Sequence, residues 1–139
     1  GSLAAAYCLS VGHVADAAVV GVQAEGADAV YRSWTSGRPV SRDRVDTIAE
    51  GIATRIPFEL TLDILCEHAA DMTLVTDDAI ADAIEMLVRE ESIVGEGAGV
   101  ASVAAARTSE RSLAGETVLL PISGANLAHA KLKRILAAE

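Results

Sequence analysis

The sequence is poor in several kinds of residue, and each shortage excludes a class of protein. One tryptophan, two tyrosines and one phenylalanine are its only aromatic residues, which disfavours an aromatic-rich β-sandwich core. No run approaches the ~18–20 apolar residues that span a bilayer, so no membrane partner is predicted. Eleven Lys and Arg stand against 20 Asp and Glu, giving a net charge of −9. Nucleic acid is excluded as a partner because it requires clustered positive charge.

Cysteine and lysine are also scarce. The two cysteines, Cys8 and Cys66, have no CxxC spacing, so a reducing, cytoplasmic compartment is predicted rather than a disulfide framework. Both are expected to be small core residues. The two lysines, Lys131 and Lys133, lie near the C-terminus, and any lysine-dependent covalent chemistry would have to use one of them. The three histidines lack metal-ligand spacing.

Apolar residues are abundant, at 51%, and their spacing alternates between helix and strand periodicity. Helices are expected over 3–12, 26–36, 57–69, from Thr76 onward, over 97–107 and over 126–138, and buried strands over 17–23, 72–76 and 117–123. This order predicts one domain, 1–139, of the α/β class, with an open, mostly parallel sheet and helices on both faces.

For two of these helices, the sequence also predicts which residues are buried. Thr76 is expected to cap its helix, with Glu85 and Arg89 paired on the exposed side. The apolar stripe of that helix is predicted to be Ile80, Ala83, Ile84, Leu87 and Val88. The helix over 57–69 is predicted to bury Phe58, Leu62, Leu65, Cys66 and Ala69 on one face.

Two glycine-containing stretches stand before expected helices, "GEGAG" at 95–99 and "PISGAN" at 121–126. Ligands of open parallel sheets lie beyond the strand ends, and glycine allows close approach to the backbone. The alternative is that both are only tight strand-to-helix turns. The dinucleotide fingerprint G-x-G-x-x-G fails because Ser102 occupies the third glycine position, and no P-loop is present.

Three longer blocks together resemble the C-terminal half of a threonine/serine dehydratase. They are "VDTIAEGIATRIPFELTLDIL" (45–65), "VTDDAIADAIEMLVREESIVGEGAGVASVAAA" (75–106) and "VLLPISGANL" (118–127). These are pyridoxal-phosphate (PLP) enzymes of fold type II, whose relatives include serine racemase. The resemblance covers essentially the whole chain but less than half of a complete enzyme, and it implies the large-domain, three-layer part of that fold.

The resemblance implies a set of cofactor-binding residues. Ser123, in "SGAN", matches the serine that hydrogen-bonds the pyridine nitrogen, and Gly124 and Asn126 belong to the same block. Glu96 matches the carboxylate beside the ring, and Gly51 in "AEG" matches a glycine against the cofactor and substrate. Gly1 would be the last residue of the family's phosphate cup, unless it is left over from an expression tag.

Departures from the family pattern are equally informative. The Schiff-base lysine lies in an N-terminal SxKxR motif that is absent here, so no catalytic residue is predicted in this chain. Some members bind a divalent cation through a glutamate, a carbonyl and an aspartate. The matching positions here are Gln23, Ala27 and Ala29, so no metal site is predicted.

The resemblance implies a lyase that converts L-threonine or L-serine to a 2-oxo acid and ammonia. An amino-acid substrate, a homodimer and the N-terminal half of the same enzyme are the implied partners. Three alternatives stay open. The chain could be an inactive truncated or proteolysed fragment, a relative of serine racemase or hydroxyaspartate dehydratase, or an unrelated small-molecule-binding α/β domain.

Overall fold

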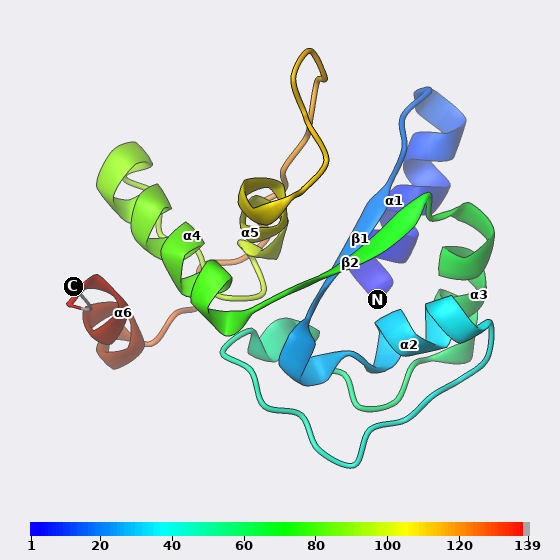
Figure 1. Ribbon diagram of the computed structural model, residues 1–139, viewed down its shortest axis with the longest axis horizontal. Helices are drawn as coiled ribbons and strands as arrows, with labels where there is room; N and C mark the ends of the chain where they lie inside the picture. The colour runs from blue at the N-terminus through cyan, green and yellow to red at the C-terminus, as the bar shows by residue number, and fades with distance from the viewer. Residues whose placement is uncertain (138–139) are drawn as a thin grey trace. The chain divides into compact units, whose positions relative to one another are not determined.

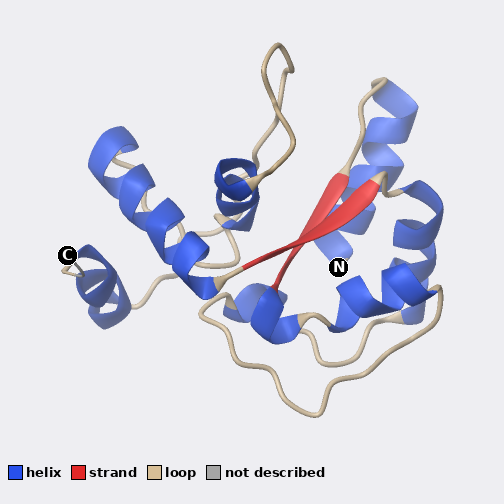
Figure 2. Ribbon diagram, in the orientation of Figure 1, coloured by secondary structure: helices blue, strands red, loops and turns tan. Residues whose placement is uncertain are grey.

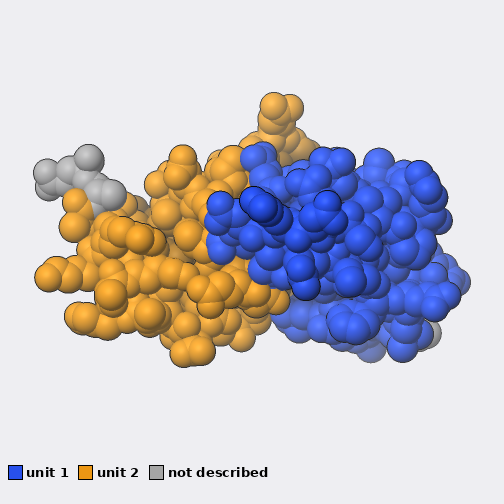
Figure 3. Space-filling view, turned by 90° about the horizontal axis from the view of Figure 1, so that it is seen from below, with its two compact units in different colours: residues 1–47, 52–74 blue, residues 48–51, 75–139 orange. Residues whose placement is uncertain are grey.

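The computed structural model describes residues 1–137. The chain forms two compact units (Figure 3). Unit 1 contains Gly1–Thr47 and Ile52–Leu74, and unit 2 contains Ile48–Gly51 and the chain from Val75 onward. The expectation of a single domain over 1–139 stays a prediction. No helix within residues 1–137 is long and apolar enough to cross a membrane.

Unit 1 contains the sheet of the described chain. Its elements are helix α1 (Ser2–Val14), strand β1 (Val20–Ala24), the 3-10 turn η1 (Glu25–Ala27), α2 (Ala29–Ser36), α3 (Glu59–His68) and strand β2 (Asp71–Val75). The last residue of β2, Val75, belongs to unit 2. A second 3-10 turn, η2, covers Glu50–Ile52. β1 and β2 pair in parallel (Figures 1 and 2), which confirms the predicted α/β class.

The core of unit 1 lies between its helices and the sheet. Cys8 of α1, Val30 of α2, Leu65 of α3 and Met72 of β2 are buried in one cluster. The indole N–H of Trp34 donates to the Leu65 carbonyl oxygen at 3.1 Å, which ties α2 to α3. Apolar contacts between residues far apart in the sequence therefore stabilise helices that would be too short to be stable in isolation.

Unit 2 is built from three helices, α4 (Asp77–Glu91), α5 (Ala101–Thr108) and α6 (His129–Leu136). Their buried side chains are Ile80, Ala83, Ile84 and Leu87 of α4, Ala101, Val103 and Ala104 of α5, and Ile135 of α6. The small side chains of α5 let its backbone lie close to α4, which contacts both other helices.

The cap, the charged pair and the apolar stripe predicted for α4 are all present in the structure. The Thr76 Oγ1 accepts a hydrogen bond from the Ala79 N–H at 3.1 Å, and Arg89 Nε pairs with Glu85 Oε1 at 2.6 Å. Four members of the predicted apolar stripe are buried, and Val88 is half-buried. The cap, the charged pair and the stripe were all predicted correctly.

Replacing the α4 cap tests its contribution. We expect Thr76→Ala to lower the free energy of unfolding by about 0.5–2 kcal/mol, because the Ala79 N–H loses its acceptor. Thr76→Ser, which keeps the hydroxyl, should stay within a few tenths of the wild-type value. Urea unfolding of both variants measures the difference. Equal loss in both would show that packing of the methyl group, not capping, is responsible.

Several predicted helix limits were wrong. α1 continues through Gly12 to Val14, because glycine ends a helix only where the chain also adopts a capping conformation. α5 begins at Ala101, since 97–100 form an irregular turn, and α6 begins at His129 rather than at residue 126. The predicted end of the last helix, Ala138, lies outside the described residues.

The predicted third strand, 117–123, was also wrong. Within residues 1–137 the sheet consists of β1 and β2, and 117–123 belongs to no strand. Its apolar side chains are exposed, at 45% for Val118 and 80% for Leu119. A strand requires a neighbouring extended backbone to share a ladder of hydrogen bonds. The end of this segment instead bonds to the Gly99 carbonyl oxygen, in a turn, and to the Ser102 hydroxyl of α5.

Helix α3 buries fewer residues than predicted. Leu62 and Leu65 are in the core, but Phe58 is 75% exposed. Phe58 is the N-cap residue and has extended backbone, so it does not continue the helical stripe. Cys66 is exposed as well, which contradicts its predicted place in the core, whereas Cys8 is buried as predicted.

The two thiols should therefore react very differently. Burial raises the pKa of Cys8, which reduces its thiolate fraction at mildly alkaline pH. We expect a thiol reagent to modify the exposed Cys66 in the folded protein, and Cys8 only after unfolding. Mass spectrometry of the modified peptides, with and without urea, measures this. Equal rates at both cysteines in the folded protein would contradict it.

Candidate functional site

A pocket of about 290 Å³ lies within unit 2. It is lined by three short stretches and one helix side chain: Ile48, Glu50 and Gly51; Glu96, Gly97 and Ala98; Asn126, Leu127 and Ala128; and Lys131. Its size lies at the lower end of the ~300–1,000 Å³ typical of small-molecule pockets. Residues far apart in the sequence thus enclose one cavity.

Glycine is required where these stretches approach each other. A β-carbon added at Gly97 would lie 2.8 Å from the Ile48 carbonyl oxygen, and one at Gly51 would lie 2.9 Å from the Ala98 β-carbon. One at Gly99 would lie 2.5 Å from the Gly124 carbonyl oxygen. The "GEGAG" stretch is therefore more than a tight turn, because Gly97 and Gly99 each admit the backbone of another chain segment.

Glu96 connects two of the pocket stretches. Its backbone N–H donates to the Gly124 carbonyl oxygen at 2.9 Å, and its side chain is half-buried. A β-carbon at Gly124 would lie 2.9 Å from the Glu96 Cδ. The absence of a side chain at Gly124 thus gives space to the Glu96 carboxylate at the pocket wall.

The structure brings together some of the predicted site residues. Gly51, Glu96 and Asn126 line the pocket, and Gly124 contacts Glu96. Ser123 is exposed and outside the lining, with its backbone N–H donating to the Gly99 carbonyl oxygen at 3.3 Å. Gly1 lies in unit 1, beside Thr61 and Leu65. Their roles toward a cofactor stay predictions.

Lys131 was missed as a pocket residue. Its Nζ lies 2.8 Å from Glu50 Oε1, and its side chain is 22% exposed. The hydrogen bond from Lys131, with the charge of the same ammonium group, holds the pKa of Glu50 below its ordinary value. No local signal could find this pair, because its members are 81 positions apart in the sequence.

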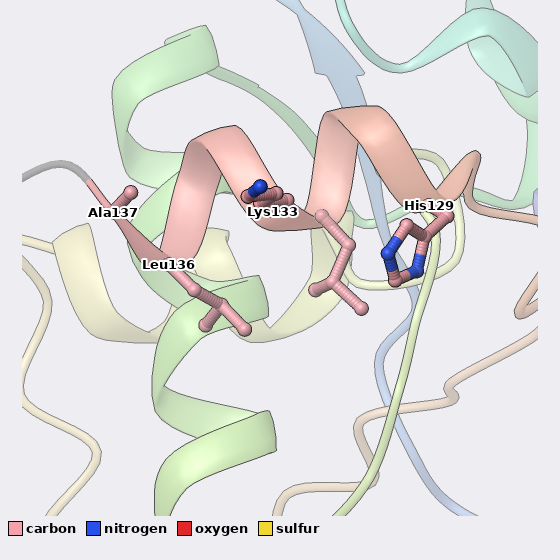
Figure 4. A pocket seen from close by; sticks show the side chains of 5 residues that line it. His129, Lys133, Leu136 and Ala137 are labelled. Atoms are coloured by element: carbon pink, nitrogen blue, oxygen red, sulfur yellow. The ribbon is translucent and has the colours of Figure 1, made fainter.

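A second depression, of about 360 Å³, lies on α6 alone. Figure 4 shows the side chains that line it, which are those of His129, Leu132, Lys133, Leu136 and Ala137. No other element contributes to its lining. With one wall it has no convergent polar groups, which are typical of a binding site.

The positions that match the family's metal ligands have other surroundings here. The Gln23 Oε1 accepts a hydrogen bond from the Tyr31 N–H at 2.9 Å, and Ala27 and Ala29 are fully buried. Within the described part of the chain, no three His, Cys, Asp or Glu side chains are grouped to hold a metal ion. The expectation of no metal site stays a prediction.

Comparison with known proteins identifies the chain. Residues 1–124 match the family described as pyridoxal-phosphate dependent enzyme. The chain belongs to this family. Its cofactor is therefore pyridoxal 5′-phosphate. The predicted resemblance to fold type II dehydratases is confirmed.

Relatives of this PLP-dependent chain include threonine-degrading enzymes. L-threonine ammonia-lyase of Thermotoga maritima is 34% identical over 118 residues, which cover 85% of this chain and 29% of the relative. The crystal structure of a threonine deaminase from T.th. matches with a TM-score of 0.79 and 28% identity, covering 92% of this chain and 47% of that one. The processed form of threonine deaminase isoform 2 from Solanum lycopersicum matches with a TM-score of 0.87 and 28% identity, covering 99% and 39%. The chain thus spans less than half the length of these proteins.

The pocket of this PLP-family chain fits one face of a flat cofactor ring. Gly51, Gly97 and Ala98 place no side chain larger than a methyl group at its wall. Lys131 is the one lysine in the lining, and its ammonium is paired with Glu50. The lining contains no tetraglycine cup for a phosphate. The described residues of the lining therefore fit the ring, and they include neither a phosphate cup nor an unpaired lysine.

Proposed function

We propose that this chain forms the C-terminal part of the active site of a PLP-dependent lyase that dehydrates and deaminates L-threonine or L-serine. One observation carries the proposal: the glycine-walled pocket beside Glu96 lies in a chain whose relatives are named threonine ammonia-lyase and threonine dehydratase. The products would be a 2-oxo acid and ammonia. By itself, the chain is proposed to be inactive, because it lacks the family's lysine motif.

The mechanism divides the work between cofactor and protein. Pyridoxal phosphate, when bound, withdraws electrons from the amino acid and so acidifies its α-proton. Gly51, Gly97 and Ala98 are proposed to support the flat ring and exclude water from it. Ser123 is proposed to be a neutral hydrogen-bonding partner for the pyridine nitrogen, and Glu96 to fix the position of the ring edge.

The N-terminal half of the same enzyme is the proposed partner. The chain spans 29% of the Thermotoga enzyme, which leaves room for the lysine and phosphate-binding residues in the remainder. The exposed apolar side chains of Val118, Leu119, Leu120 and Ile122 offer a surface for that half to cover. A cytoplasmic location is proposed from the two cysteines without CxxC spacing, and a homodimer from the family.

Ligand binding to the chain alone tests the pocket directly. We would titrate it with pyridoxamine 5′-phosphate, which needs no lysine, and follow backbone amide resonances by NMR. We expect the amides of Gly51, Glu96, Gly97 and Ala98 to shift, while those of α1 do not. Absence of shifts at millimolar ligand would remove the support that the pocket gives to the proposal.

Activity is tested in a chimera. This chain would replace its matched 118-residue region in the Thermotoga enzyme, which supplies the lysine. We expect 2-oxo acid to form from L-threonine or L-serine. A chimera that folds and holds the cofactor, yet turns over neither substrate, would exclude the proposed lyase. Racemisation of serine without 2-oxo acid would support the racemase alternative instead.

Ser123→Ala in the same chimera tests the ring-nitrogen partner. We expect kcat to fall by about 10²–10³-fold, the effect of losing one preorganised hydrogen-bonding group in a catalytic site. The absorption spectrum of the bound cofactor should change as well, since the hydroxyl would contact the ring. Ser109→Ala, at an exposed position, is the matched control. Unchanged turnover in Ser123→Ala would show that this hydroxyl has no such role.

A further inference from the structure

Segment 48–51 has an unusual place in the chain. Ile48–Gly51 belongs to unit 2, whereas the residues before and after it belong to unit 1. Three of its four residues, Ile48, Glu50 and Gly51, line the pocket. Its last two residues begin the 3-10 turn η2, whereas Ile48 and Ala49 belong to no helix or strand and are positioned by a hydrogen bond and by packing.

The first half of the segment is held from two sides. The Ile48 N–H donates to the Asp77 Oδ2 at 2.9 Å, at the start of α4. Ala49 is fully buried, and Gly97 leaves space for it, since a β-carbon there would lie 3.1 Å from the Ala49 Cα. Ile48 and Ala49 are thus fixed by a charged hydrogen bond and by close packing.

The second half begins the 3-10 turn η2 and makes one ion pair. Glu50 and Gly51 are exposed, and the Glu50 carboxylate contacts the Lys131 ammonium at 2.8 Å. Lys131 lies on α6 and also lines the pocket. Gly51, the next residue, faces Ala98 and Glu96, where a β-carbon would lie 2.9 Å from the Ala98 β-carbon. The ion pair therefore joins two segments of the pocket lining, next to the close approach of Gly51 to Ala98.

We propose that the Glu50–Lys131 pair is a clasp that positions Gly51 and sets the width of the pocket. Both are positioning residues, because they act on the ligand through the wall rather than through the reacting atoms. The clasp is proposed to position Gly51 in the ligand-free protein. Its effect on cofactor binding rests on the proposed function. An open clasp leaves Ile48 and Ala49 in place and frees Glu50 and Gly51 to move away from Ala98.

Hydrogen exchange of the purified chain tests the clasp without any ligand. We expect Lys131→Met and Glu50→Gln to speed exchange in peptides covering 48–51 by about two- to fivefold, the range for an exposed ion pair. Exchange in α4 should not change. Lys133→Met, two positions along the same helix and exposed, is the matched control and should match the wild type. The charge-reversed double variant Glu50→Lys, Lys131→Glu should restore slow exchange.

Salt and ligand complete the test. Molar salt should speed exchange of 48–51 in the wild type and have little effect in Lys131→Met, because the Glu50 carboxylate then has no Lys131 ammonium to pair with. Unchanged exchange in Lys131→Met, or faster exchange throughout unit 2, would overturn the clasp. In the pyridoxamine 5′-phosphate titration, Lys131→Met should weaken binding by a similar factor. A clasp seen by exchange, with no ligand shifts in any variant, would remove the support that the pocket gives to the proposed function and leave the clasp standing.

Discussion

Gly97→Ala should abolish ligand binding in the unit 2 pocket and destabilise unit 2 by about 1–3 kcal/mol, the usual cost of overpacking. The added methyl group would lie 2.8 Å from the Ile48 carbonyl oxygen and 3.1 Å from the Ala49 Cα. These are backbone atoms, so the segment itself must move rather than a flexible side chain. Urea unfolding followed by circular dichroism, together with the pyridoxamine 5′-phosphate titration, measures both effects.

Gly115→Ala is the control for this substitution. An added β-carbon at Gly115 meets no atom within 4 Å, so its cost comes only from the positive φ of 80°. We expect a modest loss of stability and unchanged ligand shifts. If Gly97→Ala also kept wild-type shifts at Gly51 and Ala98, the wall formed by segment 48–51 would not depend on close contact with Gly97.

Leu65→Ala should destabilise unit 1 by about 2–5 kcal/mol, the range for a buried leucine replaced by alanine. Leu65 is fully buried among Ala5, Cys8, Val30 and Met72. Trp34, the single tryptophan, donates to the Leu65 carbonyl oxygen, so its fluorescence reports on unfolding at this position. Urea unfolding followed by that fluorescence measures the loss.

Leu60→Ala on the same helix is the matched control. Leu60 is 73% exposed, and we expect its removal to change stability by less than about 0.5 kcal/mol. Similar losses from both substitutions would mean that helix propensity, rather than burial, determines the stability of α3. A small loss for Leu65→Ala alone would show that the surrounding side chains close the cavity.

Local sequence patterns predicted the secondary structure where they were strong. α4 has its cap, its dipole-favoured aspartates, its apolar stripe and the Glu85–Arg89 pair within 15 residues, so each signal supports the others. The two strands of the sheet were predicted because each is a short, β-branched run beside a helix. The predictions were wrong where an apolar residue was assumed to be buried. Phe58 and Cys66 are apolar but exposed, because residue type alone does not determine exposure.

The third expected strand shows the same limit. The run "TVLLPIS" has the composition of a buried strand, yet no strand pairs with it within residues 1–137. A strand forms only when its backbone can hydrogen-bond to a second strand, and the local sequence of a segment does not show whether such a partner lies beside it. Composition gave the tendency of this segment, and the absence of a pairing strand within the described residues decided its conformation.

The candidate site likewise has features that the sequence predicts and features that only the structure shows. The sequence by itself determined the family, the glycines that admit neighbouring segments, and Glu96 between two of them, because these depend on residue types in fixed order. Only the tertiary structure decided that segment 48–51 becomes a pocket wall, that Ser123 lies outside the lining, and that Lys131 pairs with Glu50. The physical reason is distance along the chain: propensity and capping act over about four residues, whereas this ion pair joins residues 81 positions apart.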